Sequence, residues 1–454
     1  MKSILFVIPW SSFFAGTPGP SFADAPERAP EGVVGLATWL IAKGAEARIA
    51  DTQKMLRNNN GSTEQTLDDL WSLCLDFRPD IIGFSFFTAR FEHVDTIFKD
   101  LTKRYDEASI AKPMMTAGGV HPTLLPEVTM SFIPFDALIL GEGELPLLKL
   151  LNDEPPETIK GIYLQNGASL EKADIIDNLD ELPFPDWSLV DKAYYTQPSH
   201  QISNTTLHKV MPITFSRGCM YRCNFCAHSC FLKPRCHSAD YCIEKLKSVA
   251  AQCNIDTFVI QDSSIGNFHS NWEEVCRRLI KMGSPYRWWA NLRANQAEEG
   301  FLRLMKEAGC IKLFFGFESG SPRILERMNK RITLDQCRNA AMLCHQVGIP
   351  FYTSYIVNYF GEEDEDMLLT EKLILETRPT SLAINKFSPI PGSNDYEKSQ
   401  ALLKPYINTV HDWTVLGRLL SPVLFGNMPP ERFEYWNEHF KSLRFKINTH
   451  ENPN

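Results

Sequence analysis

The stretch SRGCMYRCNFC, residues 216–226, places Cys219, Cys223 and Cys226 in a CxxxCxxC pattern directly after the apolar run Val210–Phe215. Three thiolates this close can bind three irons of a [4Fe-4S] cluster and leave the fourth iron open to a substrate or cofactor. The alternatives are a structural zinc site and simple buried thiols. Zinc favours paired CxxC knuckles and four protein ligands, and no second CxxC or Cys/His pair lies downstream.

The residues beside the cysteines favour the cluster over zinc. Phe225 precedes the third cysteine, and a basic turn, Arg217–Gly218, precedes the first. The motif CxxxCxFC at the end of a strand resembles the signature of the radical S-adenosylmethionine (SAM) enzymes. The resemblance implies that SAM binds the open iron through its amino and carboxylate groups, and that its reductive cleavage gives a 5′-deoxyadenosyl radical. It also implies an external electron donor of the flavodoxin or ferredoxin type.

Composition limits the class of protein further. With 454 residues and 44% apolar content, the chain is long enough for two or three domains with hydrophobic cores. A net charge of −9 without a basic run argues against nucleic-acid binding. Twelve cysteines without paired spacing do not resemble a secreted disulfide framework, so we expect a reducing, cytoplasmic location.

The N-terminus MKSILFVIPW superficially resembles a signal peptide. Pro9 and the serines after it end the apolar run after about seven residues, at the short limit for such a segment. We therefore expect Ile4–Ile8 to form a buried strand. No segment of the sequence is apolar over the length needed to span a bilayer.

Apolar runs and helical patterns alternate along the first third of the chain. Uniformly apolar strands separated by helices predict an α/β fold with a doubly wound parallel sheet covered on both faces. The expected strands are Ile4–Ile8, Ala47–Ala50, Asp80–Phe86, Pro113–Gly119 and Ala137–Leu140. We expect a Rossmann-like domain at 1–151, a linker at 152–209, a partial barrel at 210–395 and a C-terminal helical segment at 396–454. The linker should contain a hairpin with an Asn166–Gly167 turn.

Ligands of parallel sheets bind beyond the carboxyl ends of the strands. In the first domain these ends carry Ser85, Thr88, Gly118, Gly119, His121, Gly141 and Glu142. The segments PEGVVGLATWL, PDIIGFSFFT, AGGVHPT and LGEGE, in this order, resemble the cobalamin-binding domain that precedes the barrel in one radical SAM class. The resemblance implies that those seven residues contact cobalamin, with glycines allowing the broad corrin to approach the backbone. The DxHxxG ligand motif is absent, so we expect His121 to be a hydrogen-bonding loop residue and not a cobalt ligand.

Strand-like runs recur six times between residues 212 and 391, at PITFS, DTFVIQD, YRWWANL, IKLFFGFES, FYTSYIV and SLAINKFSPI. Helical stretches separate them, which predicts a (β/α)6 barrel short of the usual eight units and open at its side. Active residues of such barrels lie at the carboxyl ends of the strands. The candidates by this rule are Asp262, Ser263, Asn291, Arg293, Glu318, Ser319, Asn358, Pro389 and Ile390. Trp288 and Trp289 should pack on opposite faces of their strand.

The run from Arg293 to Tyr396 also resembles the radical SAM pattern. The resemblance implies that Glu318 bonds the SAM amino or ribose groups and that the backbone near Ile390 lines the adenine. It further implies SAM contacts from Phe225, Ser263, Arg293 and Ser319. The alternative for Glu318 is an ion pair with a neighbouring helix, and for Arg293 an ion pair on the barrel rim. The sequence departs from the family in VNYFGEEDED, where a Gly-x-Pro-Gly-Glu-like turn is usual, and in QDSSIGN.

Several other segments have simpler interpretations. Cys230, Cys236 and Cys242 match no paired ligand set, so we expect buried thiols and not a second cluster. The acidic run at 362–366 should be the first turn of a helix. Helical patterns after Tyr396 could cap the barrel and contact the substrate.

These resemblances imply a cobalamin-dependent radical SAM enzyme. The first expectation is methylation of an unactivated carbon of a small-molecule substrate, with one SAM remethylating cobalamin and a second forming the radical. The alternative is cyclisation, ring rearrangement or oxidation on the same scaffold, with cobalamin as an electron carrier. A third hypothesis is a non-catalytic iron- or zinc-binding regulator. The motifs are shared by the first two activities, because fold does not determine function.

Overall fold

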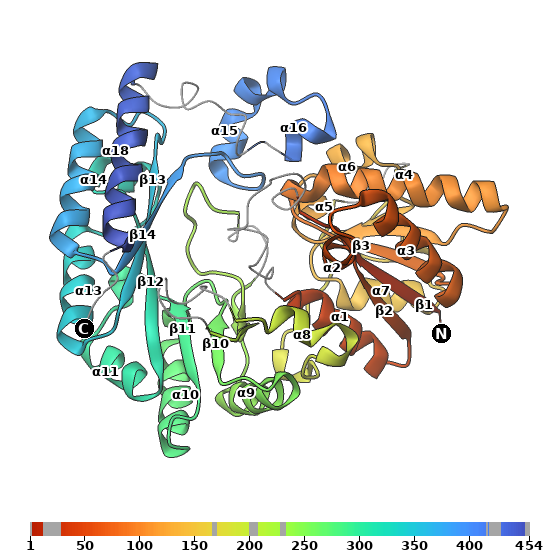
Figure 1. Ribbon diagram of the computed structural model, residues 1–454, viewed down its shortest axis with the longest axis horizontal. Coiled ribbons are helices and arrows are strands. Elements are labelled where there is room, and N and C mark those ends of the chain that lie inside the picture. Colours follow the sequence, from red (N-terminus) through yellow and green to blue (C-terminus); the bar gives the residue numbers. More distant parts are fainter. Residues whose placement is uncertain are drawn as a thin grey trace. The chain divides into compact units, whose positions relative to one another are not determined.

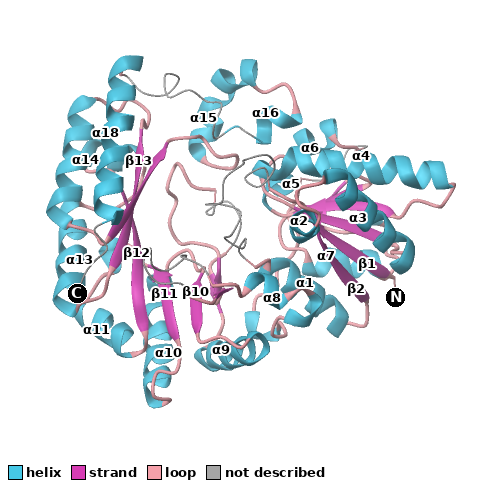
Figure 2. Cartoon of the chain, in the orientation of Figure 1, coloured by secondary structure: helices cyan, strands magenta, loops and turns pink. Residues whose placement is uncertain are grey.

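The computed structural model describes residues 2–11, 29–165, 170–198, 208–227, 233–414, 416 and 428–449. They form two compact units (Figures 1 and 2). Unit 1 contains the described residues of 1–24, 30–194 and 403–419, and unit 2 those of 25–29, 195–402 and 420–454. The predicted domain boundaries remain predictions, and each unit is described by itself.

Unit 1 is built on one sheet in the order β2-β1-β3-β4-β5-β6. Its strands are β1 (Ser3–Ile8), β2 (Glu46–Asp51), β3 (Ile81–Ser85), β4 (Met114–Gly118), β5 (Ala137–Ile139) and β6 (Ile162–Tyr163). The first five are parallel, and β6 is antiparallel to β5. The order 2-1-3-4-5 is that of flavodoxin-like doubly wound sheets, whose ligands bind where the winding reverses, between β1 and β3.

Both faces of this sheet are covered, as predicted. Successive side chains of a strand point to opposite faces, and Ile4, Leu5, Phe6 and Val7 of β1 are all buried. On one face, Ile4 and Phe6 share a core with side chains of helices α1 and α7. The α-helices that precede the barrel strands are α1 (Glu31–Ala42), α2 (Thr52–Asn58), α3 (Thr63–Phe77), α4 (Phe91–Ala108), α5 (Val120–Leu124), α6 (Pro126–Phe132), α7 (Glu144–Leu151) and α8 (Lys192–Tyr195).

The segment expected to be a linker is largely part of unit 1. Ile159 and Ile162 belong to its buried core, and Ile176, Leu182 and Leu189 pack against that core. The Asn166–Gly167 turn lies outside the described residues, so the hairpin stays a prediction. What the structure shows is that β6 pairs with β5.

Unit 2 contains six parallel strands in the order β14-β13-β12-β11-β10-β7. They are β7 (Val210–Ile213), β10 (Thr257–Ile260), β11 (Arg287–Asn291), β12 (Cys310–Glu318), β13 (Phe351–Val357) and β14 (Ser381–Lys386). Each lies beside the next strand of the main sheet in chain order, which confirms the predicted six-unit β/α arrangement. A small antiparallel hairpin, β8 (Ser216–Arg217) with β9 (Arg235–Cys236), flanks the cysteine motif.

Helices follow the strands of unit 2 (Figure 1). They are α9 (Ala239–Cys253), α10 (His269–Lys281), α11 (Glu299–Glu307), α12 (Pro322–Arg327), α13 (Leu334–Val347), α14 (Asp364–Thr377), α15 (Asn394–Leu403) and α18 (Pro430–Thr449). Acidic residues occupy the first turn of α14, as predicted, where they meet the positive end of the helix dipole. Trp288 is buried and donates its indole N–H to the Ala308 carbonyl at 3.0 Å. Trp289 packs against Val210 and Val259.

The C-terminal segment divides between the two units. Helix α16 (Val410–Thr414) belongs to unit 1, where Thr414 Oγ1 accepts from the Glu92 backbone N–H at 2.9 Å. Helix α18 belongs to unit 2, where Asn448 Oδ1 accepts from Leu382 N of β14 at 2.9 Å. Arg432 of α18 also pairs with Asp364 of α14 at 2.9 Å. The described contacts of α18 are thus with the edge strand and an outer helix of the barrel.

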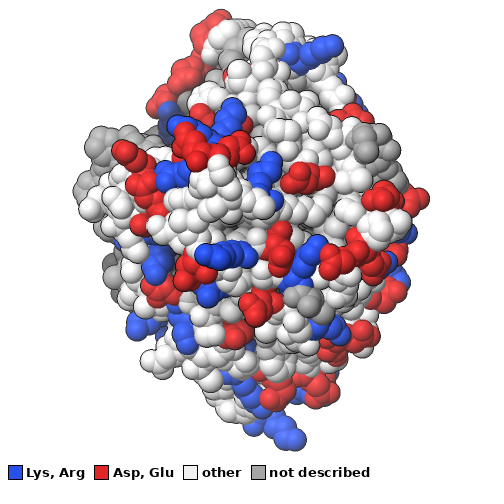
Figure 3. Space-filling model, turned by 90° about the vertical axis from the view of Figure 1, so that its right-hand side faces the viewer, with Lys and Arg blue, Asp and Glu red and all other residues white. Residues whose placement is uncertain are grey.

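Two further findings bear on the partners. Among the residues that the structure describes, no helix combines the length and apolarity needed to cross a bilayer. On the face drawn in Figure 3, basic and acidic side chains are interspersed. That face therefore presents no broad basic surface of the kind that binds nucleic acid.

Candidate functional site

The three cysteines of the motif lie on the loop that follows β8. Cys223 is buried, and Cys219 and Cys226 are partly exposed. Cys226 N donates to the Cys223 carbonyl at 3.1 Å, which turns the chain between them. Within the described residues, no three His, Cys, Asp or Glu side chains converge as they would around a single metal ion. A cluster makes a different demand, since each thiolate binds its own iron.

Polar groups that suit thiolates lie next to two of the sulfurs. Arg293 Nη1 is 3.8 Å from Cys223 Sγ, and Asn267 Nδ2 is 3.9 Å from Cys219 Sγ. N–H groups beside the sulfurs can donate hydrogen bonds to them when they bind iron. The residues present therefore fit an iron-sulfur cluster.

Hydrogen bonds hold the cysteine loop against the end of α12. Asn224 donates its backbone N–H to the Met328 carbonyl at 2.9 Å and its side-chain amide to the Arg327 carbonyl at 2.7 Å. Asn329 Nδ2 donates to the Arg222 carbonyl at 2.6 Å. On the other side, Asp395 N of α15 donates to the Asn224 carbonyl at 3.0 Å. A loop without regular structure is thereby fixed from two helices.

Asp262 positions the chain that leads into the loop. Its Oδ1 accepts backbone N–H groups from Phe215 at 2.7 Å and Ser216 at 3.1 Å. Burial raises its pKa to about 6, against the lowering effect of these hydrogen bonds. Ser263, the predicted SAM contact that follows, is partly exposed. The role of Asp262 is structural, and the sequence rule for strand ends found it without identifying that role.

Arg293 is buried and contacts the cysteine loop directly. Its guanidinium lies 3.5 Å from the centre of the Tyr221 ring, and Nη2 donates to the Lys330 carbonyl. None of the described carboxylates pairs with it, so the rim ion pair considered for Arg293 is absent there. A planar guanidinium stacked on an aromatic ring and aimed at a thiol is a fixed positive charge beside the motif.

Glu318 ends β12 and forms a buried ion pair with a partner that the sequence did not identify. Lys330 Nζ donates to Glu318 Oε1 at 2.8 Å, and each side chain is only 9% exposed. Ser354 Oγ donates to the other carboxylate oxygen at 3.3 Å. The ammonium also lies 5.6 Å from the centre of the Phe225 ring in the cysteine loop. The alternative of an ion pair for Glu318 is therefore observed, with a lysine from the turn after α12.

Gly316 makes room for this pair. A Cβ at that position would lie 2.2 Å from Glu318 Oε1 and 2.9 Å from Lys330 Nζ. Breaking a buried ion pair by removing one partner costs about 3–5 kcal/mol, because the remaining charge stays buried without compensation. The pair is thus a constraint on the local sequence. The signal that could have found Lys330 is weak, since a lysine in a polar turn usually faces solvent.

The departures after β13 form a tight turn beside the same loop. Asn358 has a φ of +63°, and Glu362 Oε2 accepts from Tyr359 N at 3.0 Å. Burial raises the pKa of Glu362 to about 8, so it carries a proton at neutral pH. Tyr359 donates its hydroxyl to Asp395 Oδ2 at 2.5 Å. Buried polar contacts therefore hold this turn at the place where the sequence lacks the expected Gly-x-Pro-Gly-Glu-like pattern.

Two predicted SAM contacts lie in different surroundings. Ser319 is fully buried and accepts from Ser321 N at 3.1 Å, with Thr370 Oγ1 3.4 Å away on α14. Ile390 is 49% exposed, and its carbonyl accepts from Ser393 N at 3.0 Å. Their SAM contacts remain predictions.

In unit 1, the candidate cobalamin residues gather at one edge, because β3, β4 and β5 are neighbouring parallel strands. His121 Nδ1 lies 3.0 Å from Thr88 Oγ1, so His121 forms the expected hydrogen bond within the loops. Its ring is fully buried beside Phe86, Phe91 and Trp413. Desolvation lowers its pKa to about 3, so the imidazole is neutral at physiological pH.

The glycines at this edge serve the packing of the loops themselves. Gly119 has a φ of +92°, and a Cβ there would lie 3.1 Å from Phe86 N and 3.2 Å from Ser85 Oγ. Gly141 has a φ of +98°, and its N–H donates to Thr123 Oγ1 at 3.0 Å. Gly119 is therefore required by the approach of the β3 loop, whatever ligand binds. Gly118 ends β4 and Glu142 is buried, while Phe87 beside them is 62% exposed.

Comparison with known protein families gives a match for two separate parts of the chain. The Radical SAM superfamily model matches residues 213–374, and the B12 binding domain model matches residues 32–151. An uncharacterised methyltransferase of Pyrococcus horikoshii is 29% identical over 73% of this chain and 72% of its own. Cytidylyl-2-hydroxyethylphosphonate methyltransferase of Streptomyces wedmorensis is 25% identical, over 72% and 67%. Anaerobic magnesium-protoporphyrin IX monomethyl ester cyclase of Rubrivivax gelatinosus is 24% identical, over 75% and 61%.

Two solved structures share the fold. The radical SAM methyltransferase TsrM from Kitasatospora setae aligns with a TM-score of 0.68 at 16% identity, over 90% of this chain and 76% of that one. The cobalamin-dependent SAM radical enzyme OxsB aligns with a TM-score of 0.67 at 18% identity, over 97% and 62%. These structures show the shared fold, and the two matched models, B12 binding ahead of Radical SAM, place the chain among the radical SAM proteins that carry a B12-binding domain.

Proposed function

We propose that the protein is a cobalamin-dependent radical SAM methyltransferase acting on a carbon of a small molecule in the cytoplasm. The observation that carries the proposal is the cysteine loop itself. Three cysteines are held by α12 and α15, two of them beside N–H donors, and a buried acid-base pair lies next to the loop. Methyltransferases among the relatives favour methyl transfer as the outcome.

Cys219, Cys223 and Cys226 would hold the cluster. When bound, the cluster and SAM supply a carbon-centred radical, and cobalamin supplies a carrier for the methyl group. The protein contributes positioning and charge. Arg293 keeps a positive charge at Cys223, and Asn267 supports Cys219.

Glu318 and Lys330 would bind the amino acid end of SAM. The amino group of this end can donate its N–H groups to the Glu318 carboxylate, and its carboxylate can accept from the Lys330 ammonium. Both side chains are nearly buried, where such contacts are stronger than in water. The ring centre of Phe225, in the cysteine loop, lies 5.6 Å from Lys330 Nζ, so the pair is next to that loop. We propose that Ser263, Ser319 and the backbone at Ile390 complete the SAM site.

The edge of the sheet in unit 1 would bind cobalamin. Ser85, Thr88, Gly118, Gly119, Gly141 and Glu142 lie at or just after the carboxyl ends of β3, β4 and β5, and the exposed ring of Phe87 offers apolar surface to a corrin. His121 would support Thr88 and not bind cobalt, because its ring is fully buried.

The second candidate is a radical cyclase or oxidising enzyme on the same scaffold. The cyclase of Rubrivivax gelatinosus among the relatives is the observation in its favour. Incubation with SAM carrying a labelled methyl group separates the two functions. Label in the product supports methyl transfer, and product formation without label supports the alternative.

The test of the proposal is anaerobic reconstitution followed by measurement of iron, sulfide, corrinoid and 5′-deoxyadenosine. We expect Cys223→Ala to lose the cluster and deoxyadenosine formation. Cys236→Ala, a partly exposed cysteine of β9 outside the motif, is the matched control and should retain both. Deoxyadenosine formation by Cys223→Ala would contradict the proposal.

A further inference from the structure

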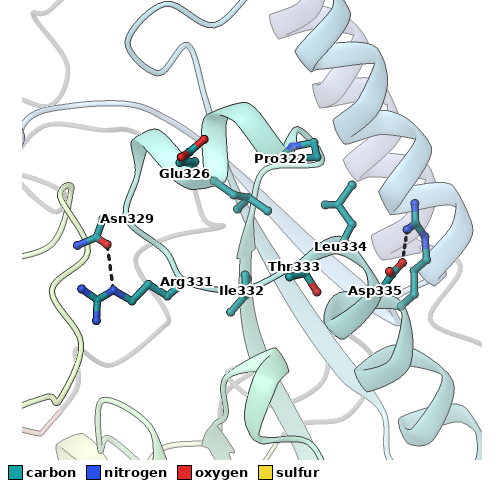
Figure 4. Close-up of a pocket in the computed structure, with 10 residues that line it drawn as sticks. Pro322, Glu326, Asn329, Arg331, Ile332, Thr333, Leu334 and Asp335 are labelled. Carbon is teal, nitrogen blue, oxygen red and sulfur yellow. Dashed lines mark hydrogen bonds and ion pairs between the residues drawn. The ribbon is translucent and has the colours of Figure 1, made fainter.

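The segment Arg327–Arg331 has two faces. Lys330 points inward to Glu318 and is 9% exposed, whereas its neighbours Asn329 and Arg331 line an open pocket of about 570 Å³ (Figure 4). Asn329 and Arg331 lie together at one side of this pocket, and Asp335 lies at the opposite side (Figure 4). The segment Arg327–Arg331 therefore lies between a surface pocket and the candidate SAM site.

The same segment is hydrogen-bonded to the cysteine loop. Asn329 lines the pocket and donates to the Arg222 carbonyl of the loop at 2.6 Å, and the Met328 carbonyl accepts from Asn224 N. Met220, next to Cys219, is 54% exposed. A protein bound over the pocket and Met220 would lie directly against the cysteine loop.

The balance of exposed charges near the cysteine loop and the pocket differs from the net charge of the whole chain. The chain has a net charge of −9. Around the loop and the pocket, the exposed carboxylates are Glu326 and Asp335, and the exposed arginines outnumber them: Arg222, Arg327, Arg331 and Arg338, of which Arg338 pairs with Asp335 at 3.0 Å. Arg331 donates Nε to Asn329 Oδ1 at 3.1 Å and forms no ion pair with the described residues. Its guanidinium is thus available to a partner.

The backbone here is held in an uncommon conformation. Asn329 and Arg331 have φ values of +48° and +53°. Left-handed backbone costs free energy in residues other than glycine and persists where the surroundings enforce it. The strain places Lys330 inward and Arg331 outward within two residues.

We propose that Met220, Arg222, Arg327, Arg331 and the adjoining pocket form the docking surface for a small acidic electron-transfer protein. We call these four residues and the pocket the arginine face. The proposal rests on the proposed function, because cleavage of the C5′–S bond of SAM to methionine and a radical consumes one electron. The donor loses one electron to the cluster, which would pass it on to SAM. That electron and one electron of the C5′–S bond become a lone pair on the methionine sulfur, and the second bond electron stays on C5′ as the radical.

The composition of the arginine face suits such a partner. Arginine and methionine are enriched in protein interfaces, and complexes of redox proteins bury little area, below about 1,200 Å². Charge complementarity in complexes of this kind mainly raises the association rate. A local basic surface on an acidic protein would direct an acidic donor to the cysteine loop and away from other surfaces.

The experiment measures cluster reduction by anaerobic stopped-flow absorbance, with the intact reconstituted protein and reduced flavodoxin at low ionic strength. Photoreduced deazariboflavin, a small uncharged reductant, is the second arm. We expect Arg331→Glu to lower the second-order rate with flavodoxin by about tenfold, a modest value for loss of electrostatic steering. The rate with deazariboflavin should stay unchanged.

Glu326→Lys gives the opposite sign. It replaces one of the two exposed acids that line the pocket by a base and should raise the flavodoxin rate several-fold at low salt. Arg303→Glu on α11, where the arginine is 60% exposed, changes net charge by the same amount as Arg331→Glu and should have no effect. Unchanged flavodoxin rates in both Arg331→Glu and Glu326→Lys would overturn the docking surface. Failure of both reductants in the unsubstituted protein would instead overturn the proposed function.

Discussion

The two candidate sites differ in the kinds of residue that form them. In unit 2, charged side chains are buried around the cysteine loop, with Arg293 beside a thiol and Glu318 paired with Lys330. In unit 1, the edge of the sheet combines close-packed backbone and glycines with hydroxyl side chains, the buried Glu142 and one neutral histidine, His121. The difference teaches that the first site should respond most to loss of charge, and the second to added volume and to acid.

The largest effect is expected from Lys330→Met in unit 2. Leaving the Glu318 carboxylate buried without its partner should cost about 3–5 kcal/mol in the free energy of unfolding. Denaturant unfolding of the protein without cofactors measures this loss. Lys372→Met, at a lysine that is 66% exposed, is the matched control and should change stability by less than about 0.5 kcal/mol.

A double variant sharpens this prediction. Glu318→Gln in the Lys330→Met background removes the uncompensated charge and should restore part of the lost stability. If the double variant is as unstable as the sum of the two single variants, the two side chains are not coupled and the buried pair is not the source of the effect.

The two units should respond to pH in opposite directions. His121 has its pKa lowered from 6.5 to about 3, so the unfolded chain binds a proton that the folded unit excludes. Its contribution is fully present above pH 6.5 and is lost as pH falls, by about 1.4 kcal/mol per pH unit. Glu362 has its pKa raised from 4.5 to about 8. Its contribution is present below pH 4.5 and is lost as pH rises toward 8.

Non-titrating variants separate these contributions. His121→Gln should flatten the decline of the unfolding free energy between pH 6.5 and pH 5 that we expect for the parent protein. Glu362→Gln should flatten the decline between pH 6 and pH 8, because the amide keeps an acceptor for Tyr359 N without a charge. Unfolding curves collected across this range test both, and parallel pH profiles for parent and variants would refute the contrast.

The smallest effect concerns added volume at Gly119. Gly119→Ala places a methyl group 3.1 Å from Phe86 N at a φ of +92°, whereas Gly61→Ala has a similar φ of +83° and open space around it. The strain of left-handed backbone is common to both variants. The additional loss at Gly119, about 1–2 kcal/mol for overpacking, isolates the close approach of the β3 loop. Equal losses would mean that the loops adjust freely.

Most of the correct predictions came from the spacing of residues that are close together in the sequence. The strand Phe351–Val357 was located to the residue, because its aromatic and β-branched side chains favour a strand. Short helices such as α2 and α7 were not predicted, since a stretch of two turns provides little periodicity. The buried-thiol prediction is confirmed for Cys242 and is wrong in degree for Cys236, which is partly exposed. Cys230 lies outside the described residues.

By itself the sequence determined the cysteine motif, the parallel α/β class and the order of the two domains, because ligand spacing and hydrophobic period are properties of neighbouring residues. Only the tertiary structure decided that Lys330 meets Glu318, that Gly316 makes room for them, and that α16 returns to unit 1. These contacts join residues through the path of the chain between them. No local pattern encodes that path, so burial of a charge becomes visible only when the whole core is assembled.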